Sequence, residues 1–201
     1  KALNFITKVT SEGKQVLLVG TKRQAQDSIK KVAEATGMPY VTERWLGGML
    51  TNWNTIGGRV KHLQDLETRM ASGELENKYN KLEVQRFQEE IEQMNVLYGG
   101  IKEMDKKLGA VFVVDVINDD NAVKEAKKLK TPIVAIVDSN ADPSQITYPI
   151  PANDDAIKTI ELICGYVESA ILEGKAKVKE APAEKAADKA PKADKIERVK
   201  V

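Results

Sequence analysis

The hydrophobic positions of this chain alternate between two patterns, one typical of buried strands and the other of amphipathic helices. Short, continuous apolar runs at 15–20, 110–115 and 132–138 predict strands covered on both faces, and 40–45 and 147–150 predict two shorter extended segments. Apolar residues recur at helical spacing over 25–36 and 121–129, and a last helix is predicted from about 154 to 173. This alternation favours an α/β fold, namely a flavodoxin-like parallel sheet with helices on both faces and Gly20 beside its topological switch point.

A segment of about sixty residues interrupts this alternation between the second and third strands, and it is too long for a crossover helix. Two apolar stripes recur within it at spacings of three and four, which is the heptad seam of a coiled coil. Ser72 and Gly73 break the periodicity between the stripes. We therefore predict an antiparallel coiled-coil hairpin over 56–105, inserted into an α/β domain that comprises 1–55 and 106–173. The stripes consist of Ile56, Val60, Leu63, Leu66 and Met70, and of Phe87, Ile91, Met94, Tyr98 and Ile101.

The two ends of the chain differ in character from this core. Lys1 is not a methionine and 2–9 reads as the final turns of a helix already under way, so we expect the true amino terminus to be missing. From 174 to 201 the composition changes to Ala, Lys, Glu, Asp and Pro with few apolar residues, which predicts a disordered charged tail. No apolar stretch approaches the length of a membrane span, and no signal peptide is visible.

Bulk charge and cysteine content narrow the possible functions only slightly. The chain carries 31 Lys and Arg residues against 30 Asp and Glu, so any affinity for a polyanion has to come from local clusters. The single cysteine, Cys164, lies in an apolar run, which excludes a disulfide framework and favours a buried thiol.

The segment that follows the first predicted strand is a candidate anion site. Gly20, Thr21, Lys22 and Arg23 leave a strand and open a helix, where free backbone N–H groups and the helix dipole favour phosphate. The segment lacks both the Gly-x-Gly-x-x-Gly and the Walker patterns, so a small-nucleotide site is disfavoured. Contact of Lys22 and Arg23 with an RNA backbone fits better, and a merely solvated basic cap remains an alternative.

The stretch from 43 to 55 is the most informative part of the sequence. Gly47 and Gly48 allow close approach of another backbone, and Arg44 can fork onto a phosphate. The side chains of Thr51 and Asn52 can reach 2′-hydroxyls or base edges of RNA. For the two tryptophans of this stretch, packing in the core is favoured over stacking on a base.

Acidic residues gather after the fourth strand and before the last helix. Asn153 as a helix cap with Asp154 and Asp155 in the first turn is ordinary helix electrostatics, and this is the favoured interpretation. A catalytic carboxylate pair is disfavoured because adjacent helical residues point about 100° apart. Asp138 together with that pair could instead bind a divalent cation. The only histidine, His62, falls on the predicted hairpin, where a solvent-facing role is favoured.

Four motifs in this order resemble the bacterial ribosomal protein S-two family, and the resemblance covers roughly 1–172. It implies a non-catalytic, cytoplasmic protein between the head and body of the small ribosomal subunit, which binds 16S ribosomal RNA and other small-subunit proteins and helps to dock the messenger-binding protein S-one. The hairpin falls where that family carries its coiled coil. The motifs are Val19-Gly20-Thr21-Lys22, Arg44-Trp45-Leu46-Gly47-Gly48-Met49-Leu50-Thr51-Asn52, Ala135-Ile136-Val137-Asp138 and Ile150-Pro151-Ala152-Asn153-Asp154-Asp155-Ala156.

The resemblance also implies roles for particular residues. RNA contact is predicted for Lys22, Arg23, Arg44, Trp45, Gly47, Gly48, Thr51, Asn52 and Arg59. No cofactor is required, but Asp138, Asp154 and Asp155 match aspartates that can take part in a zinc site, completed in the family by a histidine that this chain lacks. The alternative function is a nucleotide- or flavin-binding enzyme on a flavodoxin-like fold. A protein–protein adaptor that works through the hairpin is compatible with the ribosomal function.

Overall fold

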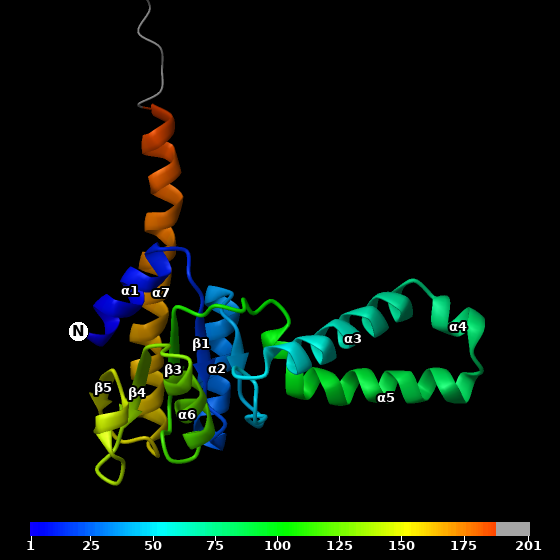
Figure 1. Ribbon diagram of the computed structural model, residues 1–201, viewed down its shortest axis with the longest axis horizontal. Coiled ribbons are helices and arrows are strands. Elements are labelled where there is room, and N and C mark those ends of the chain that lie inside the picture. The colour runs from blue at the N-terminus through cyan, green and yellow to red at the C-terminus, as the bar shows by residue number, and fades with distance from the viewer. Residues whose placement is uncertain (188–201) are drawn as a thin grey trace, which may run out of the picture.

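The computed structural model describes residues 1–187, which form a five-stranded, all-parallel sheet with helices on both faces and a helical hairpin that projects from one end (Figure 1). The strand order is β2-β1-β3-β4-β5, which is the predicted flavodoxin-like order. In the central register, Leu18 pairs with Tyr40 on one side and with Phe112 on the other. The strands are β1 (Val16–Val19), β2 (Tyr40–Val41), β3 (Ala110–Val113), β4 (Ile133–Val137) and β5 (Tyr148–Pro151).

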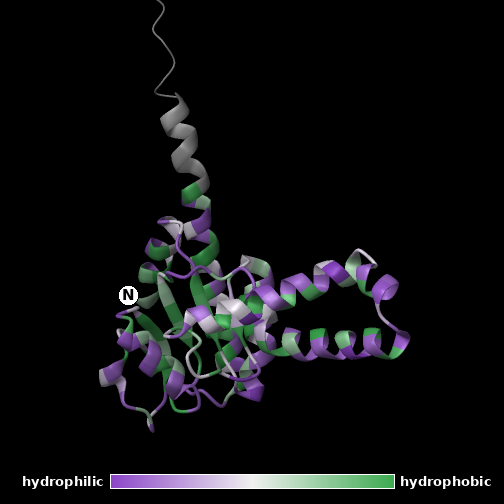
Figure 2. Cartoon of the chain, turned by 45° about the vertical axis from the view of Figure 1, so that its right-hand side comes forward, coloured by the Kyte–Doolittle hydropathy of each residue, from purple (hydrophilic) through white to green (hydrophobic). Residues whose placement is uncertain are grey.

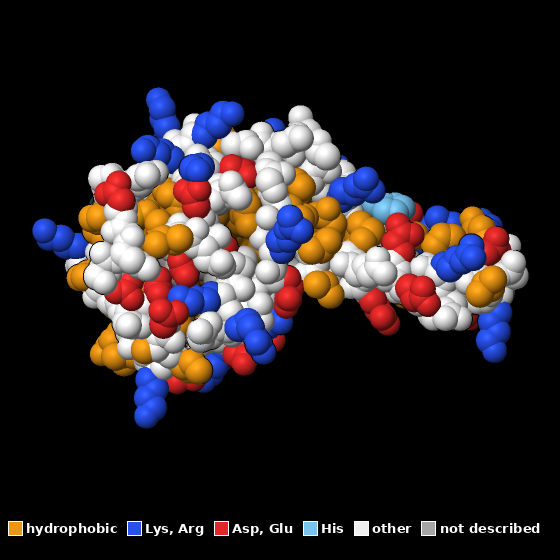
Figure 3. Space-filling view, turned by 90° about the horizontal axis from the view of Figure 1, so that it is seen from below, with side chains coloured by type: hydrophobic (Ala, Val, Ile, Leu, Met, Phe, Trp, Pro, Cys, Tyr) orange, Lys and Arg blue, Asp and Glu red, His pale blue; other side chains and the backbone are white. Residues whose placement is uncertain are grey.

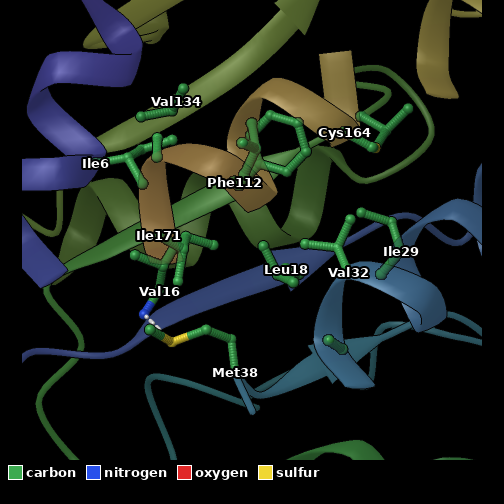
Figure 4. Packing of buried hydrophobic residues seen from close by; sticks show 14 of the residues in the cluster. Ile6, Val16, Leu18, Ile29, Val32, Met38, Phe112, Val134, Cys164 and Ile171 are labelled. Atoms are coloured by element: carbon green, nitrogen blue, oxygen red, sulfur yellow. Dashed lines mark hydrogen bonds between the residues drawn. The ribbon is translucent and has the colours of Figure 1, made fainter. Parts of the chain in front are cut away.

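One face of the sheet is covered by α1 (Ala2–Ser11), α2 (Arg23–Thr36) and α7 (Ile157–Ala187). Figure 4 shows side chains from these helices gathered over Leu18 and Phe112. The thiol of Cys164 is buried in this layer as predicted, and burial raises its pKa to about 12, so it remains protonated and unreactive.

The other face is covered by α6 (Asp120–Lys128), by the loop that follows β2 and by the base of the hairpin. Because successive strand residues point to opposite faces, Leu17 and Val111 enter this second layer while their neighbours enter the first. Trp45 also packs here and is only 7% exposed. The second layer therefore ties the hairpin base to the sheet.

The hairpin consists of α3 (Trp53–Ala71), a short α4 (Glu74–Lys78), α5 (Lys81–Tyr98) and the 3-10 turn η1 (Gly99–Ile101). The break falls at Gly73, as predicted, which adopts a left-handed φ of 72°. The extra helix α4 was not expected, and Leu75 within it is fully buried. In Figure 2, where the ribbon is coloured by hydropathy, hydrophilic and hydrophobic residues are interspersed along both arms.

The coiled-coil packing of the hairpin stays a prediction. The α3 stripe is buried at four positions, but Val84 is the only buried residue of α5. The predicted α5 seam residues Phe87, Ile91 and Met94 are half-buried, and the two arms diverge toward α4 (Figure 1). The structure therefore has an antiparallel pair of helices with one well-covered arm.

The carboxyl-terminal prediction was wrong over 174–187, because α7 continues as a helix to Ala187 instead of ending near 173. Docking against α1 favours this extension: Gly174 lies so close to Thr10 that a Cβ on it would stand 1.8 Å from the Thr10 hydroxyl oxygen. The ammonium of Lys175 also donates to the carbonyl of Thr36. This segment is rich in Ala and Lys, which are strong helix formers, but its low content of large apolar residues had indicated disorder. The rest of the predicted tail, 188–201, lies outside the described residues.

None of the helices within residues 1–187 combines the length and the apolar character that crossing a bilayer requires.

Candidate functional site at the carboxyl edge of the sheet

Because the strands are parallel, the loops that follow β1, β3 and β4 meet at one end of the sheet, here called the carboxyl edge, together with the start of α7. Flavodoxin-like sheets bind their ligands at this end. Figure 3 views the molecule from this end and shows acidic side chains interspersed among basic ones. Lys22, Arg23 and the three aspartates predicted as metal ligands therefore share this edge, whereas Arg59 lies on α3 of the hairpin.

Lys22, the residue before α2, lies within a group of carboxylates at this edge. Its ammonium is 3.1 Å from Asp115, 2.9 Å from Asp154 and 2.6 Å from Asp155. The side chains of Lys22 and Asp154 are only 18% and 5% exposed. Burial alone would lower the pKa of Lys22, but the hydrogen bonds to Asp155, Asp154 and Asp115 raise it above its ordinary value, so the group stays charged.

This network competes with the predicted role of Lys22 as an RNA phosphate contact, which stays a prediction. Three carboxylate oxygens surround the ammonium, and an RNA phosphate would have to displace them. The physical reason lies in tertiary structure, since Asp115 follows β3 whereas Asp154 precedes α7. Lys22 is an internal counter-ion for these aspartates.

The loop after β1 is also filled by a carboxylate. The hydroxyl of Thr21 donates to Asp119 Oδ1 at 2.7 Å, and the backbone N–H of Thr21 is 3.3 Å from Asp119 Oδ2. Asn118 in turn donates to the Thr21 hydroxyl at 2.6 Å. Asp119 is 2% exposed, and burial raises its pKa although the Thr21 hydrogen bonds oppose that shift. The N–H and hydroxyl of Thr21, which could have bound a phosphate, are already hydrogen-bonded to the Asp119 carboxylate.

The loop at 45–51, here called the Trp-Gly-Gly loop, wraps around a second carboxylate, that of Glu125 in α6. The Trp45 indole donates to Oε1 at 3.1 Å and the Gly48 N–H at 2.7 Å, while the N–H groups of Leu50 and Thr51 donate to Oε2 at 3.0 Å each. The Thr51 hydroxyl adds a fifth bond at 3.1 Å. Gly48 has a φ of 88°, a left-handed conformation that favours glycine.

Glu125 therefore determines the shape of the Trp-Gly-Gly loop. Burial would raise the pKa of Glu125, but hydrogen bonds from Thr51, Trp45, Gly48 and Leu50 hold it below the ordinary value. The carboxylate thus stays ionised. Because α3 begins at Trp53, directly after this loop, the same bonds join the root of the hairpin to α6.

These bonds change the roles predicted for three residues of the Trp-Gly-Gly loop. The indole of Trp45 is buried and bonded to Glu125, so the favoured interpretation of core packing is confirmed, while its predicted RNA contact stays a prediction. The backbone N–H groups of Gly48 and Thr51 are taken by Glu125, and both residues position the loop. The predicted RNA-contact residues that remain exposed are Arg23, Arg44, Gly47, Thr51, Asn52 and Arg59.

The three aspartates predicted as metal ligands do lie together. Asp138, Asp154 and Asp155 each place one oxygen within 4.8 Å of the others. Within residues 1–187 no histidine or cysteine joins this group, and His62 lies on α3 of the hairpin. The ammonium of Lys22 already contacts two of the three. Zinc favours four tetrahedral ligands that include nitrogen or sulfur, so these residues do not make a zinc site by themselves.

Comparison with known proteins decides the family. The sequence pattern of the family Ribosomal protein S2 matches residues 1–174. The chain belongs to the Ribosomal protein S2 family. Relatives named "Small ribosomal subunit protein uS2" are similar to it over 174 residues, or 87% of this chain: those of Fusobacterium nucleatum subsp. nucleatum and Coprothermobacter proteolyticus are 46% identical, and that of a Roseiflexus species is 48% identical. The matched region spans 70%, 65% and 66% of these relatives, respectively.

Sequence reasoning on this S2-family chain missed Glu125 and Asp119. Glu125 is 77 residues from Gly48 in the chain, and Asp119 is 98 residues from Thr21, so no local pattern links the partners. One weak signal existed, because Glu125 follows the inward-facing Ala122 by three residues and so lies beside the buried side of α6.

Replacement of Lys22 by alanine is expected to lower the free energy of unfolding by about 3 kcal/mol, because it leaves the buried Asp154 carboxylate without its cation. Urea unfolding followed by circular dichroism measures this loss. Adding Asp154→Asn to the Lys22→Ala chain should recover part of it, since the unpaired charge disappears. Arg23→Ala, at the exposed neighbour, is the control and should change stability by less than about 0.5 kcal/mol. Unchanged stability in Lys22→Ala would refute a structural role for the network.

Glu125→Gln is expected to lower the free energy of unfolding by about 2 kcal/mol near neutral pH, because the amide nitrogen cannot accept the bonds that one carboxylate oxygen accepted. The folded-state pKa of Glu125 lies below 4.5, so its stabilisation is complete above that value and is lost as the pH falls through the lowered pKa. The difference between wild type and variant should therefore shrink toward low pH. Urea titrations at several pH values measure it.

Glu161→Gln, at an exposed residue of α7, is the matched control for this experiment and should leave stability unchanged at every pH. A Glu125→Gln difference that stays constant between neutral and strongly acidic pH would show that the charge of Glu125 is not what the loop depends on.

Proposed function

We propose that this chain is a structural constituent of the small ribosomal subunit, binds 16S ribosomal RNA in the cytoplasm and catalyses no reaction. The observation that carries the proposal is membership of the S2 family over residues 1–174. The three relatives above, which are named as small ribosomal subunit proteins, support the same assignment.

The chemistry of the carboxyl edge agrees with a role without catalysis. Among the described residues the polar groups there are matched to one another: Lys22 to three aspartates, Thr21 to Asp119, and the Trp-Gly-Gly loop to Glu125. The loop after β1 thus has no free cradle for a nucleotide phosphate. This observation counts against the alternative of a nucleotide- or flavin-binding enzyme.

Contact with RNA at this edge would use the residues that remain exposed. Arg44 lines a hollow of about 260 Å³ beside the hairpin root, Arg23 begins α2, and Arg59 lies on α3. Arginine suits phosphate because its planar guanidinium donates two parallel hydrogen bonds. Gly47 and Asn52 are exposed in the same region and can approach ribose or base edges.

The finer parts of this proposal rest on the S2 family resemblance. They are a position between the head and body of the subunit, contacts with other small-subunit proteins, and support for docking of protein S-one in translation. An adaptor role of the hairpin is compatible with all of them, because its arms project away from the sheet (Figure 1).

Sedimentation tests the proposed function directly. A tagged chain expressed in bacterial cells is expected to co-migrate with small ribosomal subunits in a sucrose gradient at low salt. Recovery of the folded chain only at the top of the gradient, as free protein, would contradict the proposal.

Charge reversal at Arg44 tests the exposed arginines. Arg44→Glu is expected to weaken binding to a 16S ribosomal RNA transcript by about tenfold, because it removes one phosphate contact and adds a repulsive charge. The circular dichroism spectrum should remain unchanged, since Arg44 is exposed. Filter binding measures the affinity, and Lys158→Glu, at an exposed residue of α7, is the control. Equal affinities of the two variants would remove Arg44 from the contact.

A further inference from the structure

A lysine-rich hollow lies at the end of the sheet opposite the carboxyl edge. It has a volume of about 620 Å³ and is formed by the end of α1, the loop before β3 and the turn between α6 and β4. These segments precede β1, β3 and β4, so we call the hollow the amino-edge groove. Its charged lining residues are Lys8, Glu12, Lys14, Lys106, Lys107 and Lys130.

Most of this positive charge is not compensated within the protein. Lys14 pairs with Glu12 at 2.7 Å. Over the described part of the chain, no ion pair involves the other four lysines of the groove, and all four are exposed. Lys22, by contrast, is paired with three carboxylates. In a chain with a net charge of only +1, this groove concentrates unmatched cations.

The backbone beneath the lysines is held in place by close contacts. A Cβ on Gly109 would lie 2.3 Å from Val9 and 2.7 Å from the Lys14 side chain, so the loop before β3 packs directly against the end of α1. Gln15 fixes the same loop, because its side chain accepts from the Asp105 N–H at 2.7 Å. The lysines on the two segments are therefore held at a defined spacing.

Lys130 gives an independent sign that the groove has a use. It has a φ of 55° and is the only residue other than glycine with a positive φ in the described chain. Its N–H bonds to the carbonyl of Lys127 at 3.0 Å, and the next N–H bonds to that of Ala126 at 2.9 Å, so it occupies the position past a helix end where glycine is preferred. A lysine in a conformation that favours glycine retains its side chain at a conformational cost, which is characteristic of functional positions.

We propose that the amino-edge groove binds the phosphodiester backbone of ribosomal RNA. This inference rests on the proposed function and adds a second contact surface to it. Four flexible ammonium groups on a fixed framework suit a row of phosphates without reading sequence. The half-exposed Leu129 and the partly buried Leu108 beside them can cover ribose carbons. The groove is concave, which fits a strand of RNA better than a flat lipid surface.

Binding of the full chain to a 16S ribosomal RNA transcript over a series of salt concentrations tests the groove. The groove variant carries Lys8→Gln, Lys106→Gln, Lys107→Gln and Lys130→Gly. The control variant loses the same charge at exposed lysines elsewhere, through Lys31→Gln, Lys61→Gln, Lys81→Gln and Lys158→Gln. At about 0.1 M salt the groove variant should bind at least about tenfold more weakly, and its logarithmic salt slope should fall by about four. The control variant should lose much less.

The single change Lys130→Gly separates binding from folding. Because glycine fits the left-handed conformation better, this variant should melt at a higher temperature than the wild type while binding RNA more weakly. Opposite changes in the two measurements exclude unfolding as the cause of weaker binding. Unchanged affinity in both Lys130→Gly and the groove variant would overturn the proposal.

Three further outcomes are informative. If the wild-type chain migrates with small subunits and the groove variant binds the transcript equally well, the groove inference fails while the proposed function stands. If the wild-type chain neither migrates with subunits nor binds the transcript, the proposed function fails. If the groove variant loses binding to phosphatidylglycerol vesicles or to polyglutamate but binds RNA as tightly as the wild type, the assignment of RNA as the ligand is overturned.

Discussion

The arrangement of this protein depends on internal carboxylates that fill its anion-binding loops. Glu125 accepts five hydrogen bonds from the Trp-Gly-Gly loop, and Asp119 accepts both the hydroxyl and the N–H of Thr21. Both carboxylates come from α6 or the residue before it. Hydrogen bonds to a charged acceptor are about twice as strong as neutral ones, so one short helix fixes the loops that follow β1 and β2. One of those loops leads directly into α3, which links the hairpin to the sheet.

A consequence of this closure is that most hydrogen-bond donors of the segment 44–52 point toward the interior of the protein. Its glycine, indole and threonine donors point toward Glu125, while Arg44 at its start and Asn52 at its end remain exposed. The carboxyl edge, where flavodoxin-like proteins bind small ligands, is thereby internally neutralised. Lysines without an ion-pair partner among the described residues also gather at the amino-edge groove, which is the second surface proposed above for the RNA backbone.

The sequence was sufficient for the features that depend on local pattern. Continuous apolar runs and helical spacing predicted the parallel sheet, its strand order and the inserted helical pair, because each strand and helix must bury its own apolar face. Contacts between segments that are distant in the chain could not be predicted from the sequence pattern. Lys22 was assigned to RNA because its aspartate partners lie more than ninety residues away in the chain, and α7 was ended too early because its packing against α1 through Gly174 leaves no local signal. The amino-edge groove was missed for the same reason, since its lysines come from three separate segments.

Quantitative acetylation of lysines, read by mass spectrometry on the free chain and on its complex with 16S ribosomal RNA, tests the central claim most directly. If internal carboxylates close the carboxyl edge, Lys22 should react slowly in both states, because its ammonium is buried among aspartates and its raised pKa keeps it protonated. The exposed lysines of the amino-edge groove should react quickly in the free chain and become protected in the complex. Fast modification of Lys22 in the free chain and its protection by RNA, with the groove lysines unaffected, would contradict the account.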